Sequence, residues 1–164
     1  MRRVTIFSVA TSLVALALTA SSVFAAATIH NLNIDFDGLT VTATADVSGL
    51  GSTKPATAQL IVLGTAEYNC VNNGGAVVPG HNPQQATATS PVQDLGNTTN
   101  NGRGVVDVEA TLSAPQTINA RTAGCPNGKT WTANLVSVEV TGARLILKQQ
   151  GQTFFDETFD NPNN

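Results

Sequence analysis

Residues 39–47 read Leu-Thr-Val-Thr-Ala-Thr-Ala-Asp-Val, so apolar and polar side chains alternate without a break. Successive side chains of a β-strand point to opposite faces, and a period of two therefore places all the apolar residues on one face. Such a strand packs its apolar face against a second layer and leaves the polar face in water. Residues 39–47 thus predict a half-buried strand in an all-β fold.

Similar short segments continue on both sides, separated by turn signals. We expect strands at residues 29–36, 39–47, 56–71, 86–95, 105–112, 130–140, 143–149 and 153–159. Pro91 interrupts the fourth segment, Gly142 marks a bend or bulge between the sixth and seventh, and residues 60–63 form a buried stretch of the third. Residues 72–84 and 113–127 are expected to be long loops. The pattern predicts a single antiparallel β-sandwich of immunoglobulin-like architecture, with about eight strands.

The N-terminal residues have the features of a secretory signal peptide. Arg2 and Arg3 are followed by an apolar stretch, and Val23 and Ala25 supply the small residues of a cleavage site. Cleavage after Ala25 divides the chain into a signal peptide (1–25), a β-sandwich domain (26–160) and a polar tail (161–164). The predicted location is secreted or extracellular, and the mature chain has no expected membrane span.

The charge of the mature chain argues against nucleic acid as a partner. The full chain has a net charge of −3, and loss of Arg2 and Arg3 leaves six basic residues against eleven acidic ones, or −5. A negative surface repels a phosphate backbone, and the basic residues are scattered singly along the sequence.

Cys70 and Cys125 are the two cysteines of the chain. In an exported protein we expect them to form a disulfide, with a pair of free thiols as the alternative. Closing a loop of about 55 residues stabilises a fold by roughly 4 kcal/mol in the chain-entropy view. The bond is expected to fasten the loop after Cys70 to the Asn127-Gly128 turn.

The loop after Cys70 is the predicted binding loop. It is rich in residues that tolerate turn conformations, and its candidate binding residues are Asn72, Asn73, Gly74, Gly75, His81 and Asn82. A loop held in place at the end of a sandwich often carries function. A pinned loop with no ligand is the alternative.

The same residues carry a resemblance to other proteins. The pattern Cys70-x-Asn72-x-Gly74-Gly75, then Pro79-Gly80, then Cys125-Pro126-x-Gly128, resembles a group of uncharacterised exported β-sandwich proteins of bacteria and fungi. The resemblance implies export and fold, and no established activity comes with it.

Tyr68 and Trp131 are candidate aromatic contacts near the disulfide. Tyr68 stands two residues before Cys70, which imitates the tyrosine corner of immunoglobulin domains, but Trp131 follows both cysteines and does not lie between them. Packing against the disulfide explains both aromatic residues, and exposure of either one would favour a lectin-like role.

Catalytic and metal sites find little support in the sequence. Asp35-x-Asp37-Gly38 is a fragment of a calcium loop without the remaining ligands, and His30 and His81 are isolated, so no metal or other cofactor is expected. A hydrolase trio of His81, Ser90 and Asp94 is one catalytic alternative, but no Gly-x-Ser-x-Gly elbow is present. The carboxylates of Asp107 and Glu109 have a spacing within the range of glycosidase pairs, but they alternate with valines and are expected to face water.

The sequence therefore favours a non-catalytic extracellular binding or surface-interaction module. Its predicted partner is an unidentified extracellular ligand, protein or glycan. The alternative is a structural subunit of a pilus-like or coat-like assembly, in which the N-terminal strand with Leu32, Ile34 and Phe36 pairs with a neighbouring copy.

Overall fold

The computed structural model describes residues 27–50, 55–95, 102–126 and 129–164. These residues form ten β-strands and no helix: β1 (Thr28–Asp37), β2 (Thr40–Ser48), β3 (Ala56–Asn72), β4 (Val77–Pro79), β5 (Gln84–Thr89), β6 (Gln93–Asp94), β7 (Gly104–Thr111), β8 (Thr117–Ile118), β9 (Trp131–Gln149) and β10 (Gln152–Asp160). The predicted all-β fold is confirmed. The predicted signal peptide (1–25) and the Asn127-Gly128 turn lie outside the described residues.

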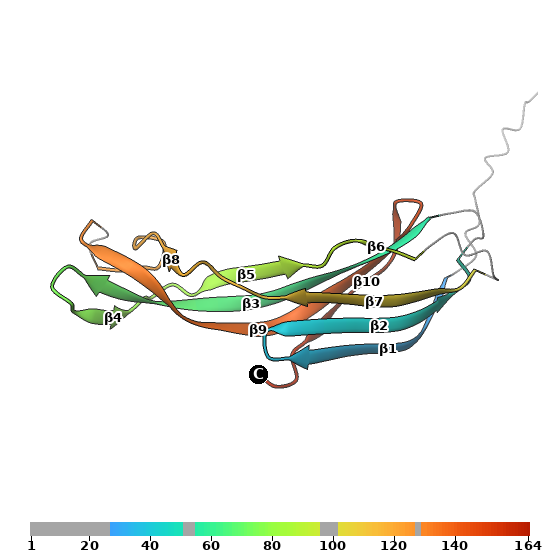
Figure 1. Ribbon diagram of the computed structural model, residues 1–164, viewed down its shortest axis with the longest axis horizontal. Helices are drawn as coiled ribbons and strands as arrows, with labels where there is room; N and C mark the ends of the chain where they lie inside the picture. Colours follow the sequence, from blue (N-terminus) through green and yellow to red (C-terminus); the bar gives the residue numbers. More distant parts are fainter. Residues whose placement is uncertain (1–26, 51–54, 96–101, 127–128) are drawn as a thin grey trace, which may run out of the picture.

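The strands form two antiparallel sheets that pack face to face as a sandwich (Figure 1). The smaller sheet has the order β1-β2-β7. In the larger sheet β9 lies between β10 and β3, and β6, β5 and β4 pair in succession with the opposite side of β3. The short β8 pairs with the beginning of β9.

The inward faces of the two sheets form the core. Its largest fully buried side chains are Leu60, Leu112, Leu145, Leu147, Val41, Val47, Val62, Val106, Val140 and Cys70. Burial alternates along β2 and β7, as the period-two pattern predicts. Leu39 differs from the prediction, because it lies in the turn before β2 and is 38% exposed.

Residues 131–149 form one strand, β9, where the sequence suggested two strands separated at Gly142. β9 pairs with β3 along the whole of β3. The irregularity expected near Gly142 is present as a register shift, because Leu63 pairs with Gly142 whereas the next residue, Gly64, pairs with Val140. A bulge of this kind adds one residue without ending the ladder, so the strand continues through it.

Two further segments differ from the prediction. Residues 72–84 are not one irregular loop, because they contain β4, which forms a hairpin with the end of β3. Residues 60–63 are a strand as expected, but only Leu60 and Val62 face the core; Ile61 and Leu63 are half-buried. Pro91 does interrupt the fourth segment, between β5 and β6.

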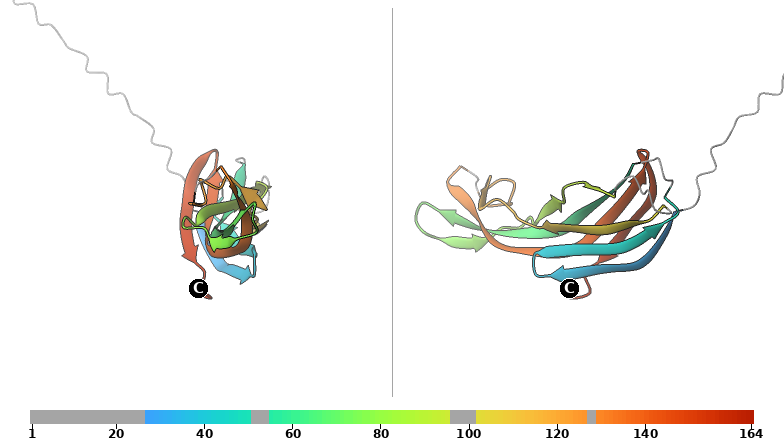
Figure 2. Two further views of the ribbon diagram at one scale, coloured as in Figure 1. Left: turned by 90° about the vertical axis from the view of Figure 1, so that its left-hand side faces the viewer. Right: turned by 45° about the vertical axis from the view of Figure 1, so that its right-hand side comes forward.

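The two sheets differ in length, which gives the molecule two distinct ends (Figures 1 and 2). β3 and β9 run the length of the molecule, whereas the smaller sheet lies over one half of them. We call the covered end, where β1 begins, β2 ends and β7 begins, the pole. The opposite end, which carries β4 and β8, is the tip. Residues 112–126 pack against the tip with Leu112 and Ala123 buried.

Candidate functional site

The disulfide lies at the tip. Cys70 and Cys125 are bonded, and their Cα atoms are 5.6 Å apart. Cys70 belongs to β3 and is fully buried, whereas Cys125 follows the turns after β8. The bond therefore joins the end of a long strand to the segment packed on it. The predicted disulfide is confirmed, and the described part of the chain contains no free cysteine.

Four of the predicted binding residues form the turn between β3 and β4. The side-chain oxygen of Asn72 accepts hydrogen bonds of 2.9 Å from the backbone N–H groups of Gly74 and Ala76. The backbone N–H of Asn72 donates to the carbonyl of Ala76. Asn73, Gly74 and Gly75 are exposed. The side chain of Asn72 therefore closes the turn, as such asparagines commonly do.

The other two predicted binding residues, His81 and Asn82, follow β4. The Asn82 side chain donates a hydrogen bond of 3.3 Å to the carbonyl of Thr122, and its backbone N–H donates to Ala123. His81 is exposed. A cavity beside this segment has a volume of only about 130 Å³, below the usual range for small-molecule sites, roughly 300–1,000 Å³. Asn72 and Asn82 therefore serve local structure. A second cavity, of about 300 Å³, lies beside β8 and is lined in part by Tyr68, Gln84 and Ile118.

The two aromatic candidates do not form an exposed platform at the tip. Tyr68 is 4% exposed, and its hydroxyl donates a hydrogen bond of 3.0 Å to the carbonyl of Pro115. Trp131 is half-buried and pairs with Asn72. A buried tyrosine ring with a satisfied hydroxyl is a packing residue, so Tyr68 offers no exposed surface to a ligand.

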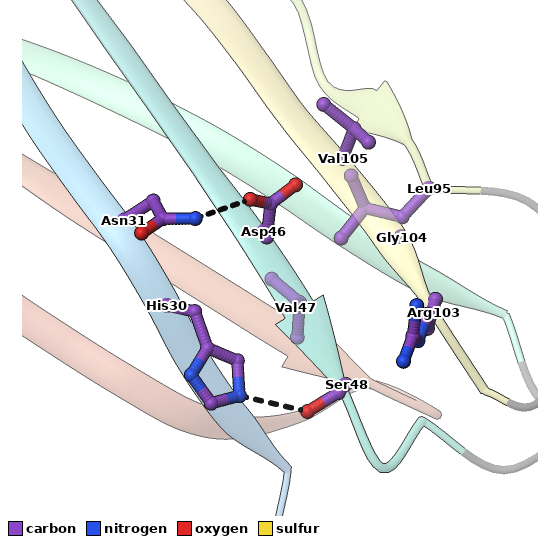
Figure 3. Close-up of a pocket in the computed structure, with 9 residues that line it drawn as sticks. All are labelled: His30, Asn31, Asp46, Val47, Ser48, Leu95, Arg103, Gly104 and Val105. Atoms are coloured by element: carbon purple, nitrogen blue, oxygen red, sulfur yellow. Dashed lines mark hydrogen bonds between the residues drawn. The ribbon is translucent and has the colours of Figure 1, made fainter.

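A larger cavity of about 570 Å³ lies at the pole (Figure 3). We call it the pole pocket. Its polar lining residues are His30, Asn31, Asp46, Ser48 and Arg103. Its apolar and small lining residues are Val47, Leu95, Gly104 and Val105. The volume lies within the range of small-ligand sites, and the pocket is open to solvent, because His30, Asn31, Asp46, Arg103 and Val105 are exposed.

The register of the smaller sheet brings the polar side chains together. Asp46 in β2 is the pairing partner of both His30 in β1 and Val105 in β7. Directly paired residues of antiparallel strands share a face of the sheet. Arg103, two residues before Val105, falls on that same face by the period of two. Figure 3 shows two hydrogen-bonded pairs, Asn31 with Asp46 and His30 with Ser48, and Arg103 apart from both, just before β7.

A β-bulge in β1 aims Asn31 at Asp46. The register of β1 against β2 shifts between His30 and Asn33, and Asn31 has a positive φ of 53°. Its side-chain amide donates a hydrogen bond of 2.8 Å to Oδ2 of Asp46. The left-handed conformation costs a non-glycine residue about 1–2 kcal/mol, although asparagine tolerates it better than most residues. Strain of this kind is concentrated at functional sites.

His30 and Ser48 form the second polar pair of the pole pocket. His30 Nε2 and Ser48 Oγ are 3.1 Å apart, the geometry of a hydroxyl beside a general base. A nucleophilic triad also needs a carboxylate that orients the imidazole. Among the residues that the structure describes, no carboxylate is hydrogen-bonded to His30, and Asp46 is held by Asn31. His30 and Ser48 are therefore paired without the third member of a triad among the described residues.

The hydrolase trio considered from the sequence is not brought together. Ser90 is 5% exposed; its hydroxyl accepts from the backbone N–H of Leu60 and donates to the carbonyl of Pro91. His81 lies at the tip, where the neighbouring Gly80 is hydrogen-bonded to Tyr68. Leu60, the partner of Ser90, and Tyr68, the partner of Gly80, stand eight residues apart on β3. At the rise of an extended strand this separation is roughly 26 Å, so Ser90 and His81 lie far apart.

The described residues give no sign of a metal centre. No group of three or more His, Cys, Asp or Glu side chains in this part of the chain is placed to hold a metal ion. Within the same residues, no helix is long and apolar enough to cross a membrane.

Sequence reasoning missed the pole pocket. One signal for it was present, because His30 and Asn31 place two successive polar residues inside an otherwise alternating strand. Such a break in the period is typical of a bulge. Arg103 and Ser48 gave no local signal, since only the pairing of β2 with β7 makes them neighbours of Asp46.

Comparison with known proteins adds no relative. No protein-family model matches the chain, and no curated protein sequence matches it. The assignment of a site therefore depends on the geometry of the pole and the tip.

Proposed function

We propose that the mature chain is an exported, non-catalytic β-sandwich that binds a ligand outside the cytoplasm through the pole pocket. One observation carries the proposal. Polar side chains from three strand ends line a cavity of about 570 Å³, and a residue with positive φ, Asn31, donates a hydrogen bond to the carboxylate of Asp46.

Export is supported by the N-terminal sequence and by the disulfide. The basic start, apolar stretch and small-residue cleavage site are those of a secretory signal. A stable disulfide is typical of proteins outside the reducing cytoplasm. A binding role is supported over catalysis because His30 lacks an orienting carboxylate within the described residues.

The proposal is tested with the mature protein, residues 26–164. The protein is screened on a glycan array and in pull-downs from culture medium, and each captured ligand is then titrated against variants. Asp46→Ala and Arg103→Ala alter the pole pocket. Asp35→Ala, an exposed carboxylate of the same sheet, and Arg121→Ala, an exposed guanidinium at the tip, are the matched controls.

The expected result is a ligand that binds the wild type and both controls but loses at least tenfold in affinity for each pole variant. Unchanged affinity of the pole variants would show that the ligand binds elsewhere on the protein and would contradict the proposal. Release of a cleaved product from the bound ligand would contradict the non-catalytic role. Far-UV circular dichroism of every variant establishes that the fold is intact.

An assembly subunit is the second candidate, and one observation favours it. The apolar side chains of β1, at the edge of the smaller sheet, remain half-exposed: Ile29, Leu32, Ile34 and Phe36. An open edge strand is a common docking point for a strand of another chain. High-mass species in size-exclusion chromatography that disappear on deletion of residues 26–37 would support assembly; a monomer in both proteins would rule it out.

A further inference from the structure

Asp46 and Arg103 carry opposite charges on one face of the pole pocket without pairing. Asp46 lies opposite Val105, and Arg103 stands two residues before Val105. The two charged residues are therefore diagonal neighbours, about 7–8 Å apart at the backbone and within reach of long side chains. Neither forms an ion pair with a residue that the structure describes. A ligand with both charges fits such a separated pair.

The two charged groups differ in how they are held. One oxygen of Asp46 accepts the hydrogen bond from Asn31, which leaves the second oxygen of the carboxylate for a cation. Arg103 is exposed and carries five N–H donors in a planar fork, which suits a carboxylate. The hydroxyl of Ser48, on the neighbouring strand, lines the same cavity.

Part of the pocket lining is apolar. Val105 is 64% exposed and lines the pocket together with Leu95 (Figure 3). A small apolar group of a ligand that packs on Val105 would remove its own apolar surface and that of the valine from water.

We propose that the pole pocket binds a small zwitterion of the α-amino acid type with an apolar side chain. The ammonium group contacts Asp46, the carboxylate contacts Arg103 and Ser48, and the apolar side chain packs on Val105. A ligand with one charge alone would pair with one of these residues and meet a like charge at the other. This inference depends on the proposed function, because it names the ligand class of the same site.

The test uses isothermal titration of the mature protein with four probes. L-Leucine carries both charges, leucinamide lacks the carboxylate, 4-methylpentanoate lacks the ammonium group, and glucose is neutral. We expect L-leucine to bind at least tenfold more tightly than each of the other three. Asp46→Asn should abolish the preference over 4-methylpentanoate, and Arg103→Ala should abolish the preference over leucinamide. Asp35→Asn and Arg121→Ala should leave the affinities unchanged.

Two outcomes would overturn the inference in different ways. If L-leucine binds no better than the one-charge probes, and a ligand from the wider screen binds through Asp46 and Arg103, the zwitterion class is wrong and the pole site stands. If neither L-leucine nor any screened ligand depends on these two residues, both proposals are wrong. Leucine binding that survives both pole substitutions would also contradict the inference.

Discussion

The backbone N–H of Asp107 donates a hydrogen bond of 2.9 Å to the side-chain oxygen of Gln93. The side-chain nitrogen of Gln93 donates in turn to the carbonyl of Val105. Gln93 belongs to β6 of the larger sheet, and the two backbone groups belong to the edge of β7 in the smaller one. One amide side chain thus occupies the place of a paired strand and joins the sheets along this side.

Replacing Gln93 tests this link. Gln93→Ala removes both hydrogen bonds and should lower the free energy of unfolding by roughly 1–2 kcal/mol. Gln93→Glu removes the donor and keeps the acceptor, so it should lower the free energy of unfolding by a similar or smaller amount. Urea unfolding measures both, with the exposed Gln85→Ala of β5 as the control. Equal stability of Gln93→Ala and Gln85→Ala would show that the link contributes nothing.

Ser90 should be a structural residue. Its hydroxyl satisfies the buried backbone N–H of Leu60, so Ser90→Ala leaves that donor without a partner and should cost about 1–3 kcal/mol. Ser137→Ala is the matched control, because the hydroxyl of Ser137 is exposed and 3.4 Å from its partner, Glu67. Thermal unfolding of the two variants gives the comparison. A loss of stability in the control as large as in Ser90→Ala would contradict the prediction.

Gly64 allows β3, β9 and Leu112 to approach one another. A Cβ atom at Gly64 would lie against the carbonyl oxygen of Glu139 and the side chain of Leu112. Gly64→Ala should therefore destabilise the fold by roughly 1–3 kcal/mol through overpacking. At Gly74 the nearest atom to such a Cβ is 3.4 Å away, so Gly74→Ala should change stability by less than about 0.5 kcal/mol. Chemical denaturation of both variants measures the two changes in the free energy of unfolding.

The disulfide should stabilise the tip and the whole domain. The double variant Cys70→Ser/Cys125→Ser should be less stable than the wild type by about 2–5 kcal/mol. Reductant should lower the unfolding midpoint of the wild type to that of the double variant and leave the variant itself unchanged. If reductant has no effect on the wild type, either the bond does not form in solution or its contribution is small, and the prediction fails.

Arg144 and Asp156 should make stability depend on pH. Two hydrogen bonds of 2.6 Å from the Arg144 guanidinium lower the pKa of Asp156. Because the folded-state pKa lies below the unfolded value, the pair stabilises the fold fully above the unfolded pKa, about 4, and loses its effect as the pH falls through the folded pKa.

The measurement is denaturant unfolding at about pH 7 and about pH 3. Asp156→Asn should lose less stability than the wild type between these two conditions. Both groups are solvent-exposed, so high salt should reduce the difference. An identical pH dependence of wild type and variant would exclude a role for the pair.

The fold was readable from the sequence where one face of a strand is buried. Residues 39–47 and 105–112 alternate because the smaller sheet has a buried face and a solvent face. The bulge expected at Gly142 is present, but the division into two strands there was wrong, because β9 continues through it. A Cβ at Gly142 would lie 2.6 Å from the carbonyl oxygen of Phe159 in β10, so the glycine permits close approach of two strands.

The site was harder to predict than the fold. The asparagines and glycines after Cys70 have the composition of a binding loop, but the same composition forms the tight hairpin between β3 and β4. The pole pocket depends on the conformation of Asn31 and on the pairing of β2 with β7. Both arise from long-range strand register, which a single sequence does not specify locally.

Because β3 and β9 extend beyond the smaller sheet, the pole pocket and the disulfide lie at opposite ends of an elongated molecule (Figure 1). β3 alone spans 17 residues, which at the rise of an extended strand is roughly 55 Å. If the tip is attached to a surface, the opening at the far end stands about 5 nm above it. At the tip the Cys70–Cys125 bond ties β3 to the segment that precedes β9, so the end of the long strand cannot separate from the chain packed on it.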